Sequence, residues 1–306
     1  MTGAGSGELL IAHEETLGGT LVDSDSSGDP ELYAPGRDPT LDELDLQRQL
    51  ERQREPDAVE PVESVAQNLE GAVGISATVS SDVHAEVEQV VFNDGGSGFT
   101  NGRPNTATVF TGIDYLDGTA NRKLSGCIPL SYELTYEQGG MVTYSLALAY
   151  QDEETDVPIP TAEVTRVDDG TSAPFHGFDL TIDGASVSKL QSATLSIDNI
   201  SRFQRGTSHI PIDAVIAAPE TTLDAEAIIS GPDKLELAYG STSATATQAS
   251  MDSVSGSVTV EVSGTTVSTY ALPQLKPDSY AWANILSTDD ATESYTMHVN
   301  GGTGVN

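Results

Sequence analysis

The strongest constraint on the fold is a period-two alternation of apolar and polar residues, which recurs along most of the chain after residue 68. The segment SGSVTVEVSGTTVSTYALP alternates strictly and turns at Ser263-Gly264. Between Ile128 and Tyr150, Gly139-Gly140 separates two further runs in which Tyr, Leu, Thr and Val alternate. Because successive side chains of a strand point to opposite faces, the pattern indicates strands with one buried face, and the turns predict hairpins.

Other segments repeat the pattern at short intervals. We interpret VGISATVS, HAEVEQVVF, TATVFTGIDYL, TTLDAEAII and SYTMHVN as strands, and we expect FHGFDLTID and SVSKLQSATLSIDNI to form a hairpin about Gly184. The segment PDKLELAYG lies between Pro232 and Gly240, which are typical helix start and stop residues. The sequence therefore predicts a single all-β domain, residues 1–306, with one or two short helices and a β-sandwich or barrel-like architecture.

A long interruption in the strand pattern covers residues 23–62. Its first part, DSDSSGDPELYAPGRDP, has the Ser, Gly, Asp and Pro content of a loop. Thr40 and Glu43 fit a capping box, and leucines follow at 41, 44, 46 and 50 with charged residues between them. This predicts a short helix, or an arm that becomes ordered against a partner. We therefore divide the chain into a long extended segment, 23–62, and a main body, 63–306.

The charge of the chain is strongly acidic. Thirteen Lys and Arg residues stand against 47 Asp and Glu residues, a formal charge of −34. This argues against wrapping of nucleic acid by phosphate neutralisation and against adhesion to an anionic membrane surface. Abundant carboxylates with few lysines are typical of proteins that work in concentrated salt, which screens their self-repulsion. The alternatives are an ordinary acidic protein or a disordered chain, but hydrophobic residues reach 37% and occur in periodic runs.

The sequence indicates a soluble, disulfide-free chain made in the cytoplasm. The N-terminal residues lack a basic region followed by a long apolar core, so we expect no secretory signal. No apolar run is long enough to span a bilayer, and we expect no membrane insertion. Cys127 is the single cysteine, and we interpret it as a buried inert thiol rather than a nucleophile.

Residue patterns for catalysis or metal binding do not stand out. None of the five histidines lies three to five residues from another His or Cys. The acidic segment DSDSSGD, 23–29, lacks the bidentate glutamate of a calcium loop, and His13 with Glu14 and Glu15 is interpreted as a solvated strand end. Pairs such as Asp168-Asp169 and Asp289-Asp290 are expected by chance in so acidic a chain. We expect no enzyme activity, no cofactor and no metal.

One family accounts for the order of the segments. From Gly184 to Leu237, the strand LSIDNI is followed by the polar stretch SRFQRGTSHIPIDAVIAAP, by the strand TTLDAEAII and by the helix PDKLELAYG. Earlier come GELLIAHEETLGGTLV, APGRDPTLDELDLQRQLERQRE and NRKLSGCIPLSYELTYEQGGMVTYSLALAYQDEE. In this order the segments resemble the tail tube proteins of long-tailed phages and tailed archaeal viruses, with their opening strand, long extended loop and paired core strands.

The resemblance implies a structural virion protein of a caudovirus-type virus. Its subunits would form a ring, usually six-fold, and stacked rings would form a tube that carries double-stranded genomic DNA without binding it specifically. The implied partners are further copies of the chain and the tape measure, distal tail and tail terminator proteins. The implied location is the virion tail, assembled in the host cytoplasm, and the acidic composition favours a halophilic archaeal host. A distal tail or tail-terminator ring protein of the same fold, and a halophilic carbohydrate-binding or surface-layer β-sandwich, are the alternatives.

Two groups of residues are candidates for contacts between subunits. Arg202 and Arg205 lie between two core strands, and their guanidinium groups suit bidentate pairing with a neighbour's carboxylates. In the segment 23–62, we expect contacts with a neighbouring ring or subunit from Leu41, Leu44, Leu50, Arg48, Arg52 and Arg54. Edge strands are expected to pair across subunits into a continuous inner barrel, and basic residues are expected to be rare on the wall of its lumen.

Overall fold

The computed structural model describes residues 7–54, 56, 60–61, 63–66, 68–95, 98–115 and 118–305, and it confirms the predicted all-β class. The described residues form two short α-helices, α1 His84–Val91 and α2 Asp233–Tyr239. The strands are β1 Gly7–His13, β2 Leu32–Tyr33, β3 Arg37–Gln47, β4 Glu51–Gln53, β5 Glu63–Val65, β6 Glu70–Thr78, β7 Ala107–Tyr115, β8 Gly118–Glu137, β9 Thr143–Ala149, β10 Asp152–Thr155, β11 Val164–Thr165, β12 Phe178–Ile182, β13 Ala185–Ser186, β14 Leu190–Asp198, β15 Ser201–Gln204, β16 Asp213–Ile216, β17 Glu220–Ile228, β18 Val254–Val262, β19 Thr265–Ala283, β20 Thr292–Asn300 and β21 Gly304–Val305.

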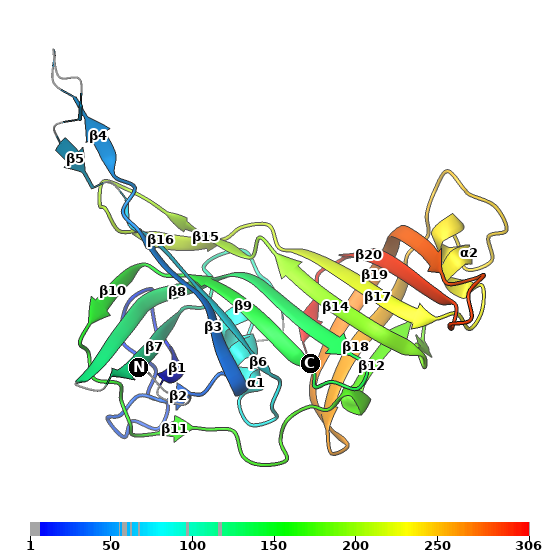
Figure 1. The fold of residues 1–306 in the computed structure, drawn as a ribbon, viewed down its shortest axis with the longest axis horizontal. Coiled ribbons are helices and arrows are strands. Elements are labelled where there is room, and N and C mark those ends of the chain that lie inside the picture. The colour runs from blue at the N-terminus through cyan, green and yellow to red at the C-terminus, as the bar shows by residue number, and fades with distance from the viewer. Residues whose placement is uncertain are drawn as a thin grey trace.

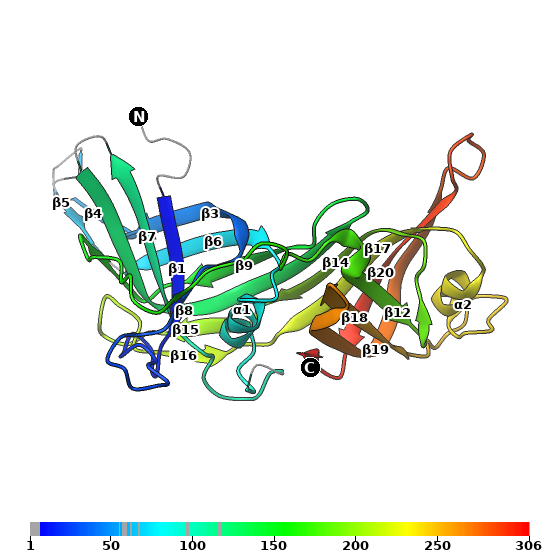
Figure 2. The same ribbon diagram turned by 90° about the horizontal axis from the view of Figure 1, so that it is seen from below.

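A long antiparallel sheet runs through the molecule in the order β3–β6–β9–β8–β14–β17–β20–β19–β18–β12–β13. The 20-residue strand β8 belongs to two parts of it: its second half pairs with β9 and β14, and its first half pairs with β7 and β10. From β7 the pairing continues to β1, β2 and β11. Figures 1 and 2 show that the sheet curls along the whole length of the elongated molecule.

The main core lies on one face of this sheet. Alternate residues of β8, β9, β14 and β17 are buried there, among them Tyr132, Leu146, Leu195 and Leu223. The helix α1 packs on the same face and contacts both β8 and β19. Because alternation places every second side chain of a strand on the core, the side chains between them point to the opposite face of the sheet.

Several predicted elements are confirmed in place. The hairpin at Gly139-Gly140 joins β8 to β9, and the turn at Ser263-Gly264 joins β18 to β19. The helix between Pro232 and Gly240 is α2, and its last turn closes on Gly240 at φ 134°. The predicted hairpin about Gly184 is only partly correct: β12 turns back through Asp183-Gly184 onto the two-residue β13, while β14 leaves to pair with β8 and β17.

Two predictions of local structure are wrong. HAEVEQVVF is the helix α1 and not a strand, because Val83, Val87, Val90 and Val91 have helical spacing and all four side chains enter the core. The short helix predicted over the segment that follows Thr40 is a strand: β3 pairs with β6 from Arg37 to Gln47, with two register shifts. Part of the segment 23–62, including residues 55, 57–59 and 62, lies outside the described residues.

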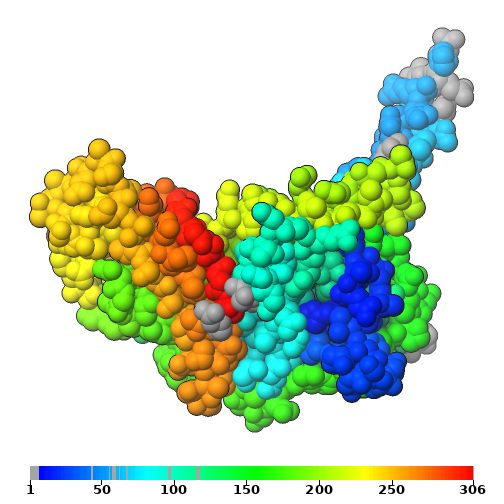
Figure 3. All heavy atoms as spheres, turned by 180° about the vertical axis from the view of Figure 1, so that it is seen from behind, coloured from blue at the N-terminus to red at the C-terminus, as the bar shows by residue number. Residues whose placement is uncertain are grey.

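The segment between β3 and β6 extends away from the body as an arm, whose described residues are 48–54, 56, 60–61, 63–66 and 68–69. Its strands β4 and β5 pair with each other, Glu51 opposite Val65, and form a sheet separate from the main one. Figures 1 and 3 show the arm standing clear of the rest of the molecule at one end of its long axis. Of the two predicted alternatives for this segment, a short helix or an extended arm, the structure therefore adopts the arm.

The last quarter of the chain completes the sheet. Strands β18, β19 and β20 lie between β12 and β17, so that β12 pairs with β18 and β17 pairs with β20. The long hairpin of β19 and β20 ends in a tip, residues 282–290, at the end of the molecule opposite the arm (Figures 1 and 2). Within the part of the chain that the structure describes, no helix is long and apolar enough to cross a membrane.

Candidate assembly surfaces

The face of the central sheet that points away from the core forms a continuous polar surface, which we call the polar face. Strand pairing aligns its side chains in rows across β6, β9, β8, β14, β17 and β20. There are three rows. The first consists of Ser76, Ser145, Glu133, Ser196, Thr222 and His298, and the second of Thr143, Thr135, Thr194, Asp224 and Thr296. The third consists of Glu137, Ser192, Glu226 and Ser294. Most of these side chains are short hydroxyls, so the surface is smooth as well as polar.

The charge of the polar face is negative. Its rows contain four carboxylates and neither lysine nor arginine. The nearest cations in the register lie on the flanking strands, Arg37 of β3 opposite Thr78 and Lys276 of β19 opposite His298. Thr296 donates to Asp224 at 2.5 Å across β17 and β20, which fixes one of the carboxylates within the surface.

The arm and the strand that leads into it carry the candidate leucines and arginines of the segment 23–62. Leu44 is partly buried and packs against the main core, so it holds β3 to the body. Leu41 and Leu50 are exposed, at 37% and 62%, and so are Leu46 and the arginines Arg48, Arg52 and Arg54. The structure thus assigns Leu44 to the interior and leaves the other candidates on the surface.

The two arginines between the core strands lie on a hairpin of their own. Strands β15 and β16 pair from Ser201 opposite Ile216 to Gln204 opposite Asp213. Ser201 is buried, Arg202 is exposed, Phe203 is partly buried and Gln204 is exposed, so the alternation of a strand continues to the partly buried Arg205. The two arginines therefore point to opposite faces of the hairpin.

Arg205 ties the hairpin to the base of the arm. Its Nη2 donates to the carbonyl oxygen of Leu69 at 2.8 Å and lies 3.7 Å from Oε1 of Glu70. The amide of Leu69 in turn donates to the carbonyl oxygen of His209 at 2.9 Å. Nε2 of Gln151 donates to the carbonyl oxygen of Pro211 at 2.8 Å, which anchors the same loop to the body. Arg205 thus has partners within its own chain, whereas the side chain of Arg202 is exposed to solvent.

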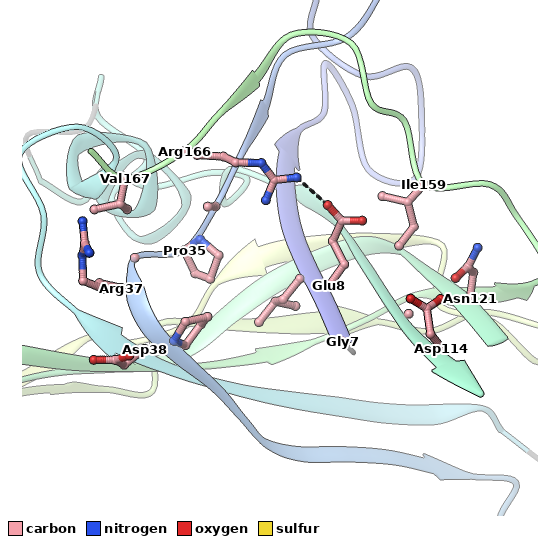
Figure 4. Close-up of a pocket in the computed structure, with 15 residues that line it drawn as sticks. Gly7, Glu8, Pro35, Arg37, Asp38, Asp114, Asn121, Ile159, Arg166 and Val167 are labelled. Atoms are coloured by element: carbon pink, nitrogen blue, oxygen red, sulfur yellow. Dashed lines mark hydrogen bonds and ion pairs between the residues drawn. The ribbon is translucent and has the colours of Figure 1, made fainter. Parts of the chain in front are cut away.

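A polar hollow of about 570 Å³ opens beside the start of β3, between β1, β7 and the segment around Arg166 (Figure 4). Nη2 of Arg166 donates to Oε1 of Glu8 at 2.6 Å, and Figure 4 shows Asp38 and Asp114 on opposite sides of the opening. Both members of the ion pair are well exposed, at 62% and 36% of their side chains. Such an exposed pair contributes little free energy, and we assign the hollow no catalytic role.

A buried polar network joins α1 to β8 and β19. The hydroxyl of Tyr270 donates to Oε1 of Glu88 at 2.5 Å and lies 2.8 Å from the hydroxyl of Tyr132. Nε2 of His84 is 3.1 Å from the Tyr132 hydroxyl and 3.2 Å from that of Tyr270. We assign the donors in series, from His84 Nε2 to Tyr132, from Tyr132 to Tyr270, and from Tyr270 to Glu88, because every hydroxyl then has an acceptor.

The titration of this network reflects its burial. Desolvation raises the pKa of Glu88 to about 7 and lowers the pKa of His84 to about 3. Nε2 of His84 lies 3.5 Å from Glu88 Oε1, but this contact is an ion pair only if His84 is protonated, which burial disfavours. A carboxyl with a pKa near neutrality is typical of catalytic acids. Here His84 is 0% and Glu88 4% exposed within the core, so we interpret the network as a clamp on α1.

A second buried carboxylate corrects the interpretation of the His13-Glu14-Glu15 segment. Glu14 is 8% exposed and accepts hydrogen bonds from the amide of Gly18, the amide of Gly126 and the hydroxyl of Thr108, at 2.8, 2.8 and 2.6 Å. It therefore locks the end of β1 to β7 and β8 rather than lying in solvent.

The single thiol of the chain is buried. Cys127 is buried as a free cysteine, and burial raises the pKa of its thiol well above the ordinary value, so the reactive thiolate is disfavoured. Among the described residues, no group of three or more His, Cys, Asp and Glu side chains is placed to hold a metal ion.

Comparison with known proteins places the chain in a family. The sequence model of the phage tail tube protein family matches residues 6–230. The matched span contains β1 to β17, and with them the arm, the β15–β16 hairpin and most of the polar face. No curated protein sequence matches the chain. Because the family match covers well over half of the 306 residues, the chain belongs to the phage tail tube protein family and is a structural component of a virion tail.

Proposed function

We propose that copies of this tail tube protein form hexameric rings that stack into a tube, and that double-stranded genomic DNA passes through its lumen. The observation that carries the proposal is the polar face: six adjacent strands present mainly Ser, Thr, Asp and Glu side chains in register, without a lysine or arginine in the rows. We assign this face to the wall of the lumen.

The chemistry of the polar face suits a conduit. Non-specific binding of DNA comes from Lys and Arg contacts to phosphates, and the rows of the polar face offer none. In molar salt, the screening length falls to about 3 Å, so long-range repulsion by Glu133 or Asp224 is weak. The missing cations therefore matter more than the carboxylates, because the DNA backbone finds no side chain that would hold it.

One edge of the sheet, the strand β3, supports closure of the subunits into a ring. β3 pairs with β6 along one edge, and no other described strand pairs with it. An unpaired edge strand presents a row of amide and carbonyl groups that can pair with another copy. A head-to-tail contact that closes by rotation generates a ring, and stacking of rings generates a tube. We assign the arm to contacts with a neighbouring subunit or ring, and Arg202 to pairing with a neighbour's carboxylates.

We further propose that the virus infects a halophilic archaeon. The support is the formal charge of −34 on a chain that folds around an extensive apolar core. In this setting most carboxylates serve solubility of the outer surface. We also propose the tape measure, distal tail and tail terminator proteins as partners, because the resemblance to tail tube proteins implies them.

Electron microscopy of the purified protein in molar salt tests the proposal. Regular tubes are the expected result. Single rings at every concentration would instead support a distal tail or tail-terminator protein of the same fold, and monomers at every salt and protein concentration would overturn self-assembly. Glu137→Gln removes one carboxylate from the polar face and adds no cation, so we expect this variant to form the same tubes as the unaltered protein.

A further inference from the structure

Two surfaces at opposite ends of the molecule share an unusual composition. The first is the arginine-leucine segment, residues 46–54, LQRQLERQR, which runs from the end of β3 into the arm and has a formal charge of 3 − 1 = +2. The second is the β19–β20 tip, residues 282–290, WANILSTDD, with a formal charge of −2. Each combines exposed apolar side chains with charges of one dominant sign, and the signs are opposite.

The apolar side chains of the tip are exposed to an extent that calls for an explanation. Leu286 is 99% exposed, Ile285 is 57% exposed and Trp282 is 50% exposed. Nε1 of Trp282 donates to the hydroxyl of Tyr280 at 2.6 Å, and that hydroxyl donates to the buried Glu293 at 2.7 Å, so the tryptophan is held in a fixed position on the hairpin. A rigid aromatic ring with neighbouring aliphatic side chains is typical of contact sites between proteins.

The arm offers the complementary chemistry. Leu50 is 62% exposed and lies between Arg48 and Arg52, in a chain that has only 13 basic residues in all. The leucines match the aliphatic side chains of the tip, and the arginines match its aspartates, Asp289 and Asp290. An arginine also binds well over the face of an exposed indole ring.

The two surfaces do not meet within one molecule. Figures 1 and 2 show the arm and the tip at opposite ends of the long axis, in both views. Complementary patches at opposite ends of one molecule can join only in a contact between different copies, and a head-to-tail contact of this kind builds rings or extended assemblies. The tip lies beyond residue 230, where the match to the tail tube family ends.

We propose that the arginine-leucine segment of one copy docks on the β19–β20 tip of a second copy of this chain. Leu46 and Leu50 cover Ile285 and Leu286, and the arginines of the arm pair with Asp289 and Asp290. This inference rests on the proposed self-assembly and names both surfaces of one of its contacts.

Cysteine pairing in assemblies of the full chain tests the docking directly. Leu50→Cys and Leu286→Cys are made in separate preparations, mixed, assembled and oxidised; the native Cys127 is buried at 0% exposure and serves as the unreactive background. We expect a disulfide-linked dimer in the mixture. The matched control is Leu50→Cys mixed with Met251→Cys, because Met251 is also exposed but lies outside the tip. Assemblies without the dimer, or with equal dimer in the control, overturn the proposal.

Charge exchange provides a second, independent test. Arg48→Asp with Arg52→Asp, and Asp289→Arg with Asp290→Arg, should each raise the protein concentration required for assembly about tenfold, measured at the lowest salt concentration at which the unaltered protein assembles. Combining all four substitutions in one chain should restore assembly close to that of the unaltered protein. If both double variants assemble normally while the unaltered protein forms tubes, the tip serves another partner and the proposal fails, although the proposed function stands. If the unaltered protein never assembles, the proposed function itself fails.

Discussion

The clamp on α1 makes a quantitative prediction about the pH dependence of stability, which Glu88→Gln isolates. Glu88 has a pKa of about 7 in the folded chain against 4.5 when unfolded, because burial disfavours its charged form. A raised pKa means that its contribution to the free energy of unfolding is complete below pH 4.5 and is lost as the pH rises through 7. The full loss amounts to about 3 kcal/mol, of which about 2 kcal/mol falls between pH 5.5 and 8.5.

The side-chain amide introduced by Glu88→Gln would keep an acceptor for Tyr270 but never ionises, so the variant avoids this loss. The free energy of unfolding is measured by urea denaturation at pH 5.5 and pH 8.5, at one salt concentration and under conditions where the protein is monomeric. The difference between variant and parent should move in favour of the variant by about 2 kcal/mol from the lower to the higher pH. Glu137→Gln, the same change at an exposed position of β8, controls for the substitution itself.

The reasoning is refuted if Glu88→Gln shifts the free energy of unfolding by the same amount at both pH values. That result would mean that Glu88 ionises in the folded chain as readily as in the unfolded one. The series of donors from His84 through Tyr132 and Tyr270 would then stabilise the carboxylate far better than its burial at 4% exposure suggests.

The remaining predictions concern the clamp, the hairpin, the arm and the polar face. Burial lowers the pKa of His84 from 6.5 to about 3, so its contribution to the free energy of unfolding is complete above pH 6.5 and falls as the pH drops toward 3. An NMR titration of the folded protein should therefore show a neutral His84 ring at pH 5, and a protonated ring at that pH contradicts the account. Arg205→Ala, which removes the hydrogen bond to the base of the arm, should lower the free energy of unfolding by about 1–2 kcal/mol, whereas Arg202→Ala should leave it unchanged and weaken assembly, as denaturation and sedimentation will show. Replacement of residues 48–65 by a short Gly-Ser turn should leave a monomer that is folded, as circular dichroism will show, but that forms no tubes. Tubes of normal length would show that assembly does not need the arm. Glu133→Lys adds a cation to the polar face, and its tubes should retain double-stranded DNA fragments that tubes of the parent release at low salt, whereas equal retention would count against the lumen assignment.

The sequence predicts best the elements whose local signals and tertiary environment agree. The hairpin at Ser263-Gly264 and the helix between Pro232 and Gly240 have turn and stop residues where the structure requires them. The strand interpretation of HAEVEQVVF fails because its apolar residues also satisfy a helical spacing, and only the core decides between the two. The relevant signal was present, since Val83, Val87 and Val90 recur at intervals of four and three.

The strand β3, which leads into the arm, shows the limit of propensity arguments. Leucines and charged residues at helical intervals favour a helix after Thr40, but β6 offers β3 a full ladder of backbone hydrogen bonds, and this pairing decides the conformation. Such a partner is distant in the sequence, so local patterns do not reveal it. The two register shifts in β3 show how the strand accommodates a sequence that does not alternate regularly.

The candidate residues separate in ways that spacing alone does not predict. Arg202 and Arg205 look alike in the sequence, but three residues along a strand place them on opposite faces, so that Arg205 binds its own chain. Leu44 joins the core while Leu50 stays exposed, because β3 leaves the body between them. The polar face, by contrast, can be read from the sequence: every second residue is Ser, Thr, Asp or Glu from Ser192 to Asp198 in β14 and from Thr222 to Glu226 in β17.

A three-dimensional reconstruction of assembled tubes by electron cryomicroscopy tests the central claim most directly. The account predicts six-fold rings in which β8, β14 and β17 line the lumen, with Glu133, Thr194 and Asp224 directed toward its axis. A lumen lined by arginines and lysines, or one in which the polar face is buried against a neighbour, would contradict it.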